Sequence, residues 1–171
     1  MGLRPAHTFR DGNKRPWTRF SKSKPRKSYI KARPHADLHQ FRMGVPNVDY
    51  DLTVALVAEE LVVVRDNSIE SARQTTNKHL ETKMIGAYSF LVKSYPHHII
   101  RENKMISGAG ADRLQKGMRC SFGRPTDRAA IVKKGSSIFV VKTFKTNLEH
   151  VKKALDKATR KLSGTYKIVV K

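Results

Sequence analysis

The chain has 171 residues, of which 35 are Lys or Arg and 14 are Asp or Glu, so its net charge of +21 cannot be neutralised internally. This excess predicts a polyanionic partner, and the lack of a long apolar run or a signal-peptide pattern favours nucleic acid over a membrane surface. A single cysteine, Cys120, excludes an internal disulfide framework and a cysteine-rich zinc site.

Residues 1–45 are predicted to form an extended basic arm that binds RNA. They carry 12 basic residues against two acidic ones, and their four prolines and few aliphatic side chains argue against a long helix or a core. Aromatic side chains alternate with the basic ones and offer stacking surfaces beside phosphate ligands; the alternative is that each aromatic residue pins the arm onto its own domain. These aromatic residues are Trp17, Phe20, Tyr29 and Phe41, and the arm's candidate rRNA-binding residues are Arg4, Arg10, Lys14, Arg15, Arg19, Lys22, Lys24, Arg26 and Lys27.

Residues 46–171 are predicted to form one α+β domain. Apolar residues recur at helical spacing over residues 68–83 and 146–162, and both segments carry the spacing of a capping box, Asn67 with Glu70 and Thr146 with Glu149. β-prone apolar runs predict strands over 52–56, 61–64, 88–93, 97–101, 128–133, 137–144 and 166–170. Two amphipathic helices among short strands predict a single sandwich, in which both helices pack on one side of a mixed, mostly antiparallel sheet. The second helix also carries a basic face opposite its apolar stripe.

Acidic residues and histidines supply no recognisable catalytic or metal site. The acids between residues 46 and 81 lack the spacing of a calcium loop, so a solvated face is expected for them, with Glu70 used as a helix cap. His97 and His98 are adjacent on an expected strand and point to opposite faces, which excludes joint metal ligation. No catalytic residue, metal or cofactor is predicted; the alternative functions are an RNA-modifying or RNA-processing enzyme and a general basic nucleic-acid-binding protein.

A glycine-rich basic loop is predicted at about residues 102–118. Its charges lie on a backbone that can turn and approach a bulky partner, with ordinary loop flexibility as the alternative. It has neither the third glycine of a dinucleotide-binding turn nor the Gly-Lys-Ser/Thr of a Walker loop. The candidate loop residues are Arg101, Lys104, Ser107, Gly108, Gly110, Arg113 and Lys116, and the basic residues that follow, Arg119 and Arg124, are assigned to rRNA binding.

Short stretches in and around this loop resemble the signature of a universal family of large-subunit ribosomal proteins, the L-sixteen family in its archaeal and eukaryotic L-ten-e branch. The stretches that carry the resemblance are Asn103–Met105, Gly110–Gln115, Gly117–Arg119 and Phe122–Pro125, joined outside the loop by Met1–Ala6, Ile69–Arg73 and Asn77–Lys78. Gly108, Cys120 and Arg124 depart from the eukaryotic pattern, and the eukaryotic carboxy-terminal extension is not present after Lys171. The resemblance is therefore to the archaeal type.

The resemblance implies that the chain is a structural constituent of the large subunit of cytoplasmic ribosomes and that it is not an enzyme. It implies binding to large-subunit rRNA in the cleft between the central protuberance and the stalk base, near the elbow of aminoacyl-site tRNA. The segment Lys104–Lys116 is then expected to point towards the peptidyl-transferase region and to help tRNA settle while RNA performs the chemistry. The implied partners are large-subunit rRNA, aminoacyl-site tRNA, neighbouring ribosomal proteins and, as a candidate, 5S rRNA; no membrane, cofactor or homo-oligomer is expected.

Overall fold

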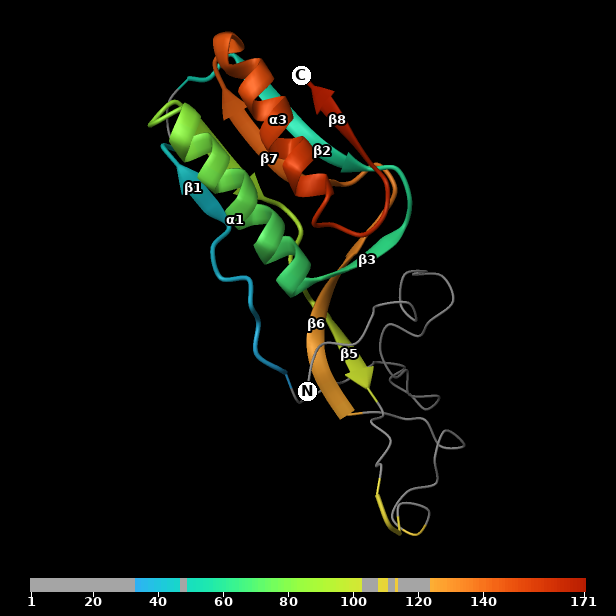
Figure 1. The fold of residues 1–171 in the computed structure, drawn as a ribbon. Helices are drawn as coiled ribbons and strands as arrows, with labels where there is room; N and C mark the ends of the chain where they lie inside the picture. The colour runs from blue at the N-terminus through green and yellow to red at the C-terminus, as the bar shows by residue number, and fades with distance from the viewer. Residues whose placement is uncertain (1–32, 47–48, 103–107, 111–112, 114–123) are drawn as a thin grey trace, which may run out of the picture.

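The structure is a computed structural model that describes residues 33–46, 49–102, 108–110, 113 and 124–171 (Figure 1). Two helices and eight short strands make up most of the described chain. In order, the elements are β1 (Arg42–Gly44), β2 (Leu52–Ala58), β3 (Val62–Arg65), α1 (Asp66–Lys83), β4 (Tyr88–Val92), β5 (His98–Glu102), β6 (Arg124–Val132), β7 (Ser137–Thr143), the 3-10 helix η3 (Lys145–Asn147), α3 (Leu148–Thr159) and β8 (Tyr166–Val170).

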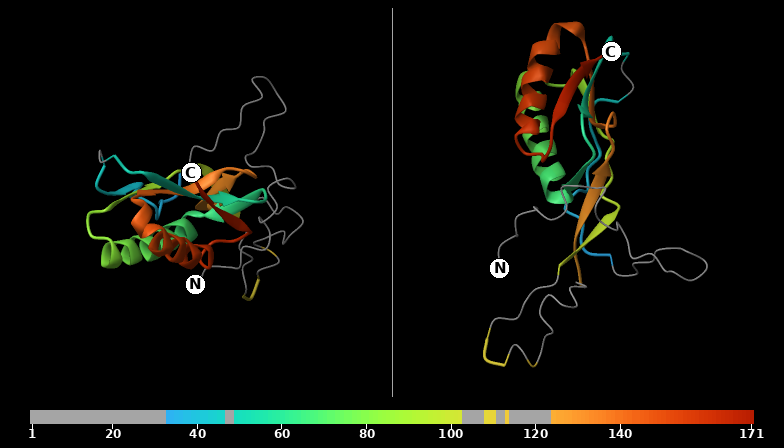
Figure 2. Two further views of the ribbon diagram at one scale, coloured as in Figure 1. Left: turned by 90° about the horizontal axis from the view of Figure 1, so that it is seen from above. Right: turned by 90° about the vertical axis from the view of Figure 1, so that its right-hand side faces the viewer.

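The strands form two sheets instead of the single expected one. Five strands pair in the order β1-β4-β7-β2-β8, and three pair in the order β3-β6-β5. Every pairing between described strands is antiparallel, so the expected mixture of directions is not found in this part of the chain. Both helices lie side by side on one face of the five-stranded sheet (Figures 1 and 2). The predicted α+β class and the placement of the helices are confirmed.

The hydrophobic core lies between the helices and the five-stranded sheet. Leu56 of β2 and Leu155 of α3 are fully buried, which shows that the apolar stripe predicted for the second helix faces the sheet. The rings of Phe90 on β4 and Phe139 on β7 meet edge to face with centroids 5.3 Å apart. This geometry adds a favourable quadrupole contact to the burial of both rings.

The last part of the predicted arm packs on the domain. Leu38 is buried in the core, and β1 pairs with β4 through Met43 and its neighbours. The ring of Phe41 stacks on Tyr95 at a centroid distance of 5.7 Å. Phe41 therefore takes the alternative role of pinning the chain to its own domain, and the boundary expected at residue 45 falls within a segment that the domain holds. Trp17, Phe20 and Tyr29, the other aromatic residues considered for stacking, lie outside the described residues.

Neither helix uses its predicted capping box. The N-cap of α1 is Arg65 and that of α3 is Asn147, and neither N-cap side chain makes a capping hydrogen bond. The carboxylate of Glu70 binds Arg73 instead of the helix terminus. Local spacing therefore located both helices but assigned the wrong partners to their polar side chains.

Asp66, expected on a solvated face, is buried at the start of α1. One carboxylate oxygen accepts a hydrogen bond from the N–H of Asp37 at 3.1 Å, and the other accepts one from the N–H of Asn67 at 2.9 Å. Burial raises the pKa of this carboxyl group, while the two N–H donors oppose the rise. Asp66 thus ties the segment before β1 to the first turn of α1.

Candidate nucleic-acid interface

Strands β5 and β6 form a two-stranded ribbon that extends beyond the helices (Figures 1 and 2). β6 has nine residues; β3 pairs with its second part, up to Val132, and β5 pairs with its first part, from Arg124. The first part was not expected to be a strand, because its sequence contains a proline and charged residues. Cross-strand pairing with β5 overrides this weak local preference. Glu102 of β5 and Arg124 of β6, the strand residues that flank the predicted loop, pair at the end of the ribbon.

A bulge interrupts the ribbon close to its end. The register shifts between Ile100 and Arg101, and Arg101 pairs with Pro125. Proline has no N–H to donate to a ladder and is tolerated at bulges, where the strand bends and its twist increases. The hydroxyl of Thr126 donates to the carbonyl oxygen of Ile100 at 3.4 Å across this irregularity. The register shift therefore accommodates Pro125 near the end of the ribbon.

Five of the predicted site residues lie in the described part of the chain. Arg101 and Arg124 come together on adjacent strands at the end of the ribbon, where Arg124 is exposed. Gly108, Gly110 and Arg113 are exposed on the segment between the strands. Gly110 has a φ of +78°, and its carbonyl oxygen accepts a hydrogen bond from the N–H of Arg113 at 3.1 Å, so the backbone turns here as predicted. The other candidates lie outside the described residues: Arg4, Arg10, Lys14, Arg15, Arg19, Lys22, Lys24, Arg26, Lys27, Lys104, Ser107, Lys116 and Arg119.

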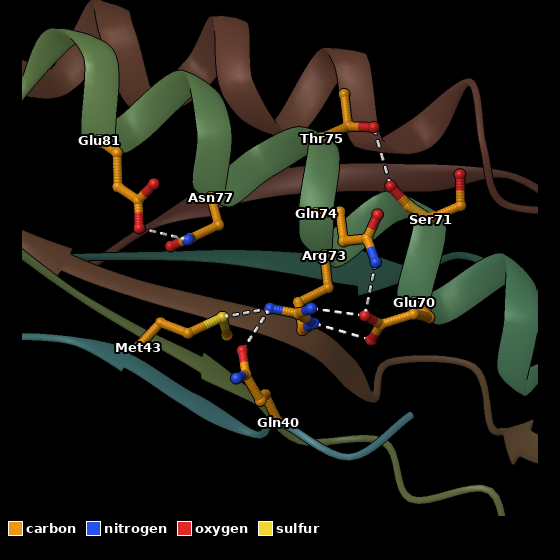
Figure 3. A network of polar contacts seen from close by, with 9 residues as sticks. All are labelled: Gln40, Met43, Glu70, Ser71, Arg73, Gln74, Thr75, Asn77 and Glu81. Carbon is orange, nitrogen blue, oxygen red and sulfur yellow. Dashed lines mark hydrogen bonds and ion pairs between the residues drawn. The ribbon is translucent and has the colours of Figure 1, made fainter. Parts of the chain in front are cut away.

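Two arginines close to the expected contact regions serve the fold. Arg128, in the basic stretch that follows the loop, donates from Nε to the carbonyl oxygen of Pro34 at 2.7 Å. Arg73 is buried on α1, where its guanidinium binds both carboxylate oxygens of Glu70, with Nε to Oε2 at 2.8 Å, and donates to Gln40 Oε1 at 3.0 Å (Figure 3). Both side chains hold the segment around β1 against the domain, which removes them from the set of free cations.

A second basic surface lies on α3. The α3 basic face consists of five exposed residues, Lys152, Lys153 and Lys157 on the helix and Arg160 and Lys161 directly after its last residue. It was recognised as a helix face in the sequence but was not included among the candidate RNA-binding residues. Helical periodicity places these cations together because the buried stripe of α3 occupies the opposite side. The exposed face can therefore meet an anionic partner as one surface.

His79 of α1 lies among these cations. Lys157 Nζ lies 3.0 Å from His79 Nδ1, so the amine donates to the imidazole. Burial lowers the pKa of His79, and the nearby cations, Lys157 first among them, lower it further. The lowered pKa of His79 favours the neutral imidazole, so the lysines and Arg160 supply the positive charge of this surface.

Other polar groups of the described chain do not assemble into a reactive site. Among the described residues, no group of three or more His, Cys, Asp or Glu side chains is placed to hold a metal ion. Neither described helix combines the length and the hydropathy needed to cross a bilayer. Glu60, one of the expected solvated acids, accepts the N–H of Thr165 at 2.8 Å and joins the turn before β8 to the end of β2.

Comparison with known proteins links this architecture to the translation machinery. Residues 17–169 match the family model described as ribosomal protein L16p/L10e. The large ribosomal subunit protein uL16 of Thermofilum pendens is 41% identical over 171 residues, covering 99% of this chain and 98% of that protein. Proteins with the same description from Methanococcus aeolicus and Saccharolobus solfataricus are 40% and 42% identical, covering 99% and 95% of this chain and 95% and 89% of their own lengths.

Proposed function

Because the chain belongs to the ribosomal protein L16p/L10e family and is an archaeal-type protein of the large ribosomal subunit, we propose that it binds large-subunit rRNA and positions aminoacyl-site tRNA. The family consists of structural ribosomal proteins, so the chain is not an enzyme, and the expected family, subunit and non-enzymatic role are confirmed. The assignment of individual contacts to rRNA and tRNA is the proposal.

One observation supports tRNA positioning above all others, namely the β5–β6 ribbon. It presents a basic, glycine-containing segment beyond the helices, with Arg113 exposed on the segment and Arg124 exposed at its base. The backbone changes direction at Gly110 through a positive φ of +78°, a conformation that favours glycine. Such a projection, which has no catalytic constellation among the described residues beside it, is suited to holding a substrate in place.

Binding to rRNA is proposed for the arm and for Arg119 and Arg124. The basic residues of the arm greatly outnumber its acids, and a protein with this charge gains affinity by releasing counterions from phosphates. The contacts with Leu38 and Phe41 fix where the arm leaves the domain. Neighbouring ribosomal proteins and 5S rRNA are further proposed partners.

The experiment compares two double variants with equal loss of charge. Arg113→Ala with Lys116→Ala changes the segment at the end of the ribbon, whereas Lys133→Ala with Lys134→Ala changes exposed lysines in the turn at the other end of β6. Large subunits that carry each variant are purified and assayed for aminoacyl-site tRNA binding. They are also assayed for peptide-bond formation with a small substrate analogue that needs no tRNA accommodation.

We expect the first variant to enter the subunit and to lose tRNA binding selectively, while the control variant retains both activities. Loss limited to tRNA binding supports positioning by the ribbon segment. Equal losses in both assays, or no loss in either, contradict positioning. Sedimentation shows separately whether each variant enters the large subunit. A variant that does not enter the subunit indicates a defect in rRNA binding.

A further inference from the structure

Strand β8 forms one edge of the five-stranded sheet, and no other described strand pairs with its outer side. Thr53 and Lys171 exchange two main-chain hydrogen bonds, of 2.9 and 2.8 Å. In an antiparallel ladder, residues that bond to the partner strand alternate with residues that do not. Alternate residues counted back from Lys171 therefore bond to β2, and the main-chain groups of Ile168 and Val170 point away from the sheet. Within the described part of the chain, this edge can therefore accept a further strand.

A groove lies beside the same edge, between β8 and the helices. It has a volume of about 560 Å³ and is lined by Ile168 and Val170 of β8, His79 of α1, and, on α3 and its C-cap, Lys152, Lys153, Asp156, Lys157 and Arg160. Val170 is 41% exposed although it is a large apolar residue. The two residues that offer their main-chain groups thus also form the apolar floor of the groove.

The wall of the groove that α3 forms is basic. It has four cations and one carboxylate, that of Asp156, which already accepts a hydrogen bond from Arg160 at 2.9 Å. The remaining imidazole nitrogen of His79, Nε2, is buried and has no hydrogen-bond partner among the described residues. Carboxylates that enter the groove would neutralise charges that now repel one another.

We propose that an extended acidic segment of a second protein binds in this groove by adding to β8 as a new edge strand. Main-chain hydrogen bonds to Ile168 and Val170 hold the segment, its apolar side chains cover the floor, and its carboxylates meet the lysines of α3. RNA fits these observations less well, because a phosphate backbone uses neither the strand edge nor the apolar floor. A groove that combines all three features matches a polypeptide.

The first measurement is backbone amide exchange on the full-length, isotope-labelled protein. The probe is the peptide Glu-Thr-Val-Thr-Val-Thr-Glu with blocked ends, which places carboxylates and valines on one face of a strand. Its matched control carries N-methyl groups on both valines, which removes the donors without changing the charge. We expect the unmodified peptide to slow exchange at Ile168 and Val170 at least tenfold and the methylated peptide to leave it unchanged. Equal effects of the two peptides, or no protection at these amides, overturn the proposal.

The second measurement is peptide affinity by fluorescence anisotropy in variants. Val170→Pro removes an outward N–H that does not bond to β2, whereas Val170→Thr retains this N–H. We expect Val170→Pro to lower the affinity for the peptide at least tenfold and Val170→Thr to lower it less than threefold. Lys153→Glu with Lys157→Glu should also weaken binding at least tenfold. Lys133→Glu with Lys134→Glu makes the same charge change at residues that do not line the groove, and should not weaken binding.

An RNA site would give a different pattern. In that case a uridine 20-mer would displace the peptide from the protein. The 20-mer would bind more weakly to the variant with Lys153→Glu and Lys157→Glu, but not to Val170→Pro. The amides of β8 would remain unprotected. This pattern would overturn the proposal. Melting curves show whether Val170→Pro is folded; if it is not, the methylated peptide and the α3 variant still decide the outcome.

Discussion

Gly44 holds the end of the arm through its backbone. It has a φ of +82°, and a Cβ at this position would overlap the carbonyl oxygen of Tyr88. The same carbonyl oxygen accepts a hydrogen bond from Val45 at 2.9 Å. The chain therefore passes so close to β4 that only glycine fits.

The substitution Gly44→Ala should destabilise the protein far more than Gly135→Ala. Gly135 has a similar φ of +81°, but a Cβ there would meet nothing within 4 Å. The control should cost about 1–2 kcal/mol for the left-handed backbone alone, and the change at Gly44 should add about 1–3 kcal/mol for overpacking. Urea unfolding measures both values, and equal losses would show that the contact with Tyr88 does not matter.

The ion pair between Arg73 and Glu70 should contribute measurably to stability. The side chains are 9% and 17% exposed, whereas those of the pair between Arg160 and Asp156 are 75% and 59% exposed. We expect Arg73→Met to cost about 1–3 kcal/mol, because a partly buried carboxylate loses its donors, and Arg160→Met to cost under about 1 kcal/mol. The comparison uses the free energy of unfolding at neutral pH.

The contribution of this pair should depend on pH in a defined direction. Hydrogen bonds from Arg73 lower the pKa of Glu70 below its ordinary value of 4.5. A carboxyl group with a lowered pKa in the fold stabilises it above the unfolded pKa and loses that effect as pH falls through the folded one. The stability difference between wild type and Arg73→Met should therefore be full at neutral pH and shrink below about pH 4.5. A difference that stays constant to lower pH would exclude the linkage.

At the scale of elements, α3 depends on its buried stripe. Leu155 has no exposed surface and lies in the core cluster, while Lys152 is exposed on the same helix. Leu155→Ala should cost about 2–5 kcal/mol through lost burial and the cavity that remains. Lys152→Ala should change stability by less than about 0.5 kcal/mol. Thermal and urea unfolding of the two variants provide the test.

Elements with strong periodicity were predictable, and elements made by distant partners were not. The stripe of α3 and the bounds of β8 could be recognised because the signal repeats within the element. β1 has only three residues, and the first part of β6 contains Pro125; both are strands because β4 and β5 pair with them. The basic ribbon residues were found from composition, whereas the open edge of β8 depends on strand order, which periodicity does not encode.

At the scale of the whole molecule, two truncations should separate the arm from the domain. Removing residues 1–32 leaves Leu38, β1 and the contact between Arg128 and Pro34 in place, so the melting temperature should change little. Removing residues 1–44 also deletes a buried leucine and an edge strand, which should lower stability by at least about 2 kcal/mol. Assembly into the large subunit should fail for both if the arm binds rRNA as proposed. Calorimetry and sedimentation give the two readouts.

The sheet order also decides when this protein can fold during its own synthesis. β2 is made early, but both of its neighbours, β7 and β8, come from the last part of the chain. Pairings this distant in sequence form slowly, and here one of them needs β8, the last strand of the described chain. A strongly basic arm is thus exposed to every nucleic acid nearby before its domain exists. Nascent chains arrested before residue 166 should be sensitive to protease, whereas released chains should resist it. A cell that makes this protein must keep the basic arm from binding other nucleic acids before the domain folds.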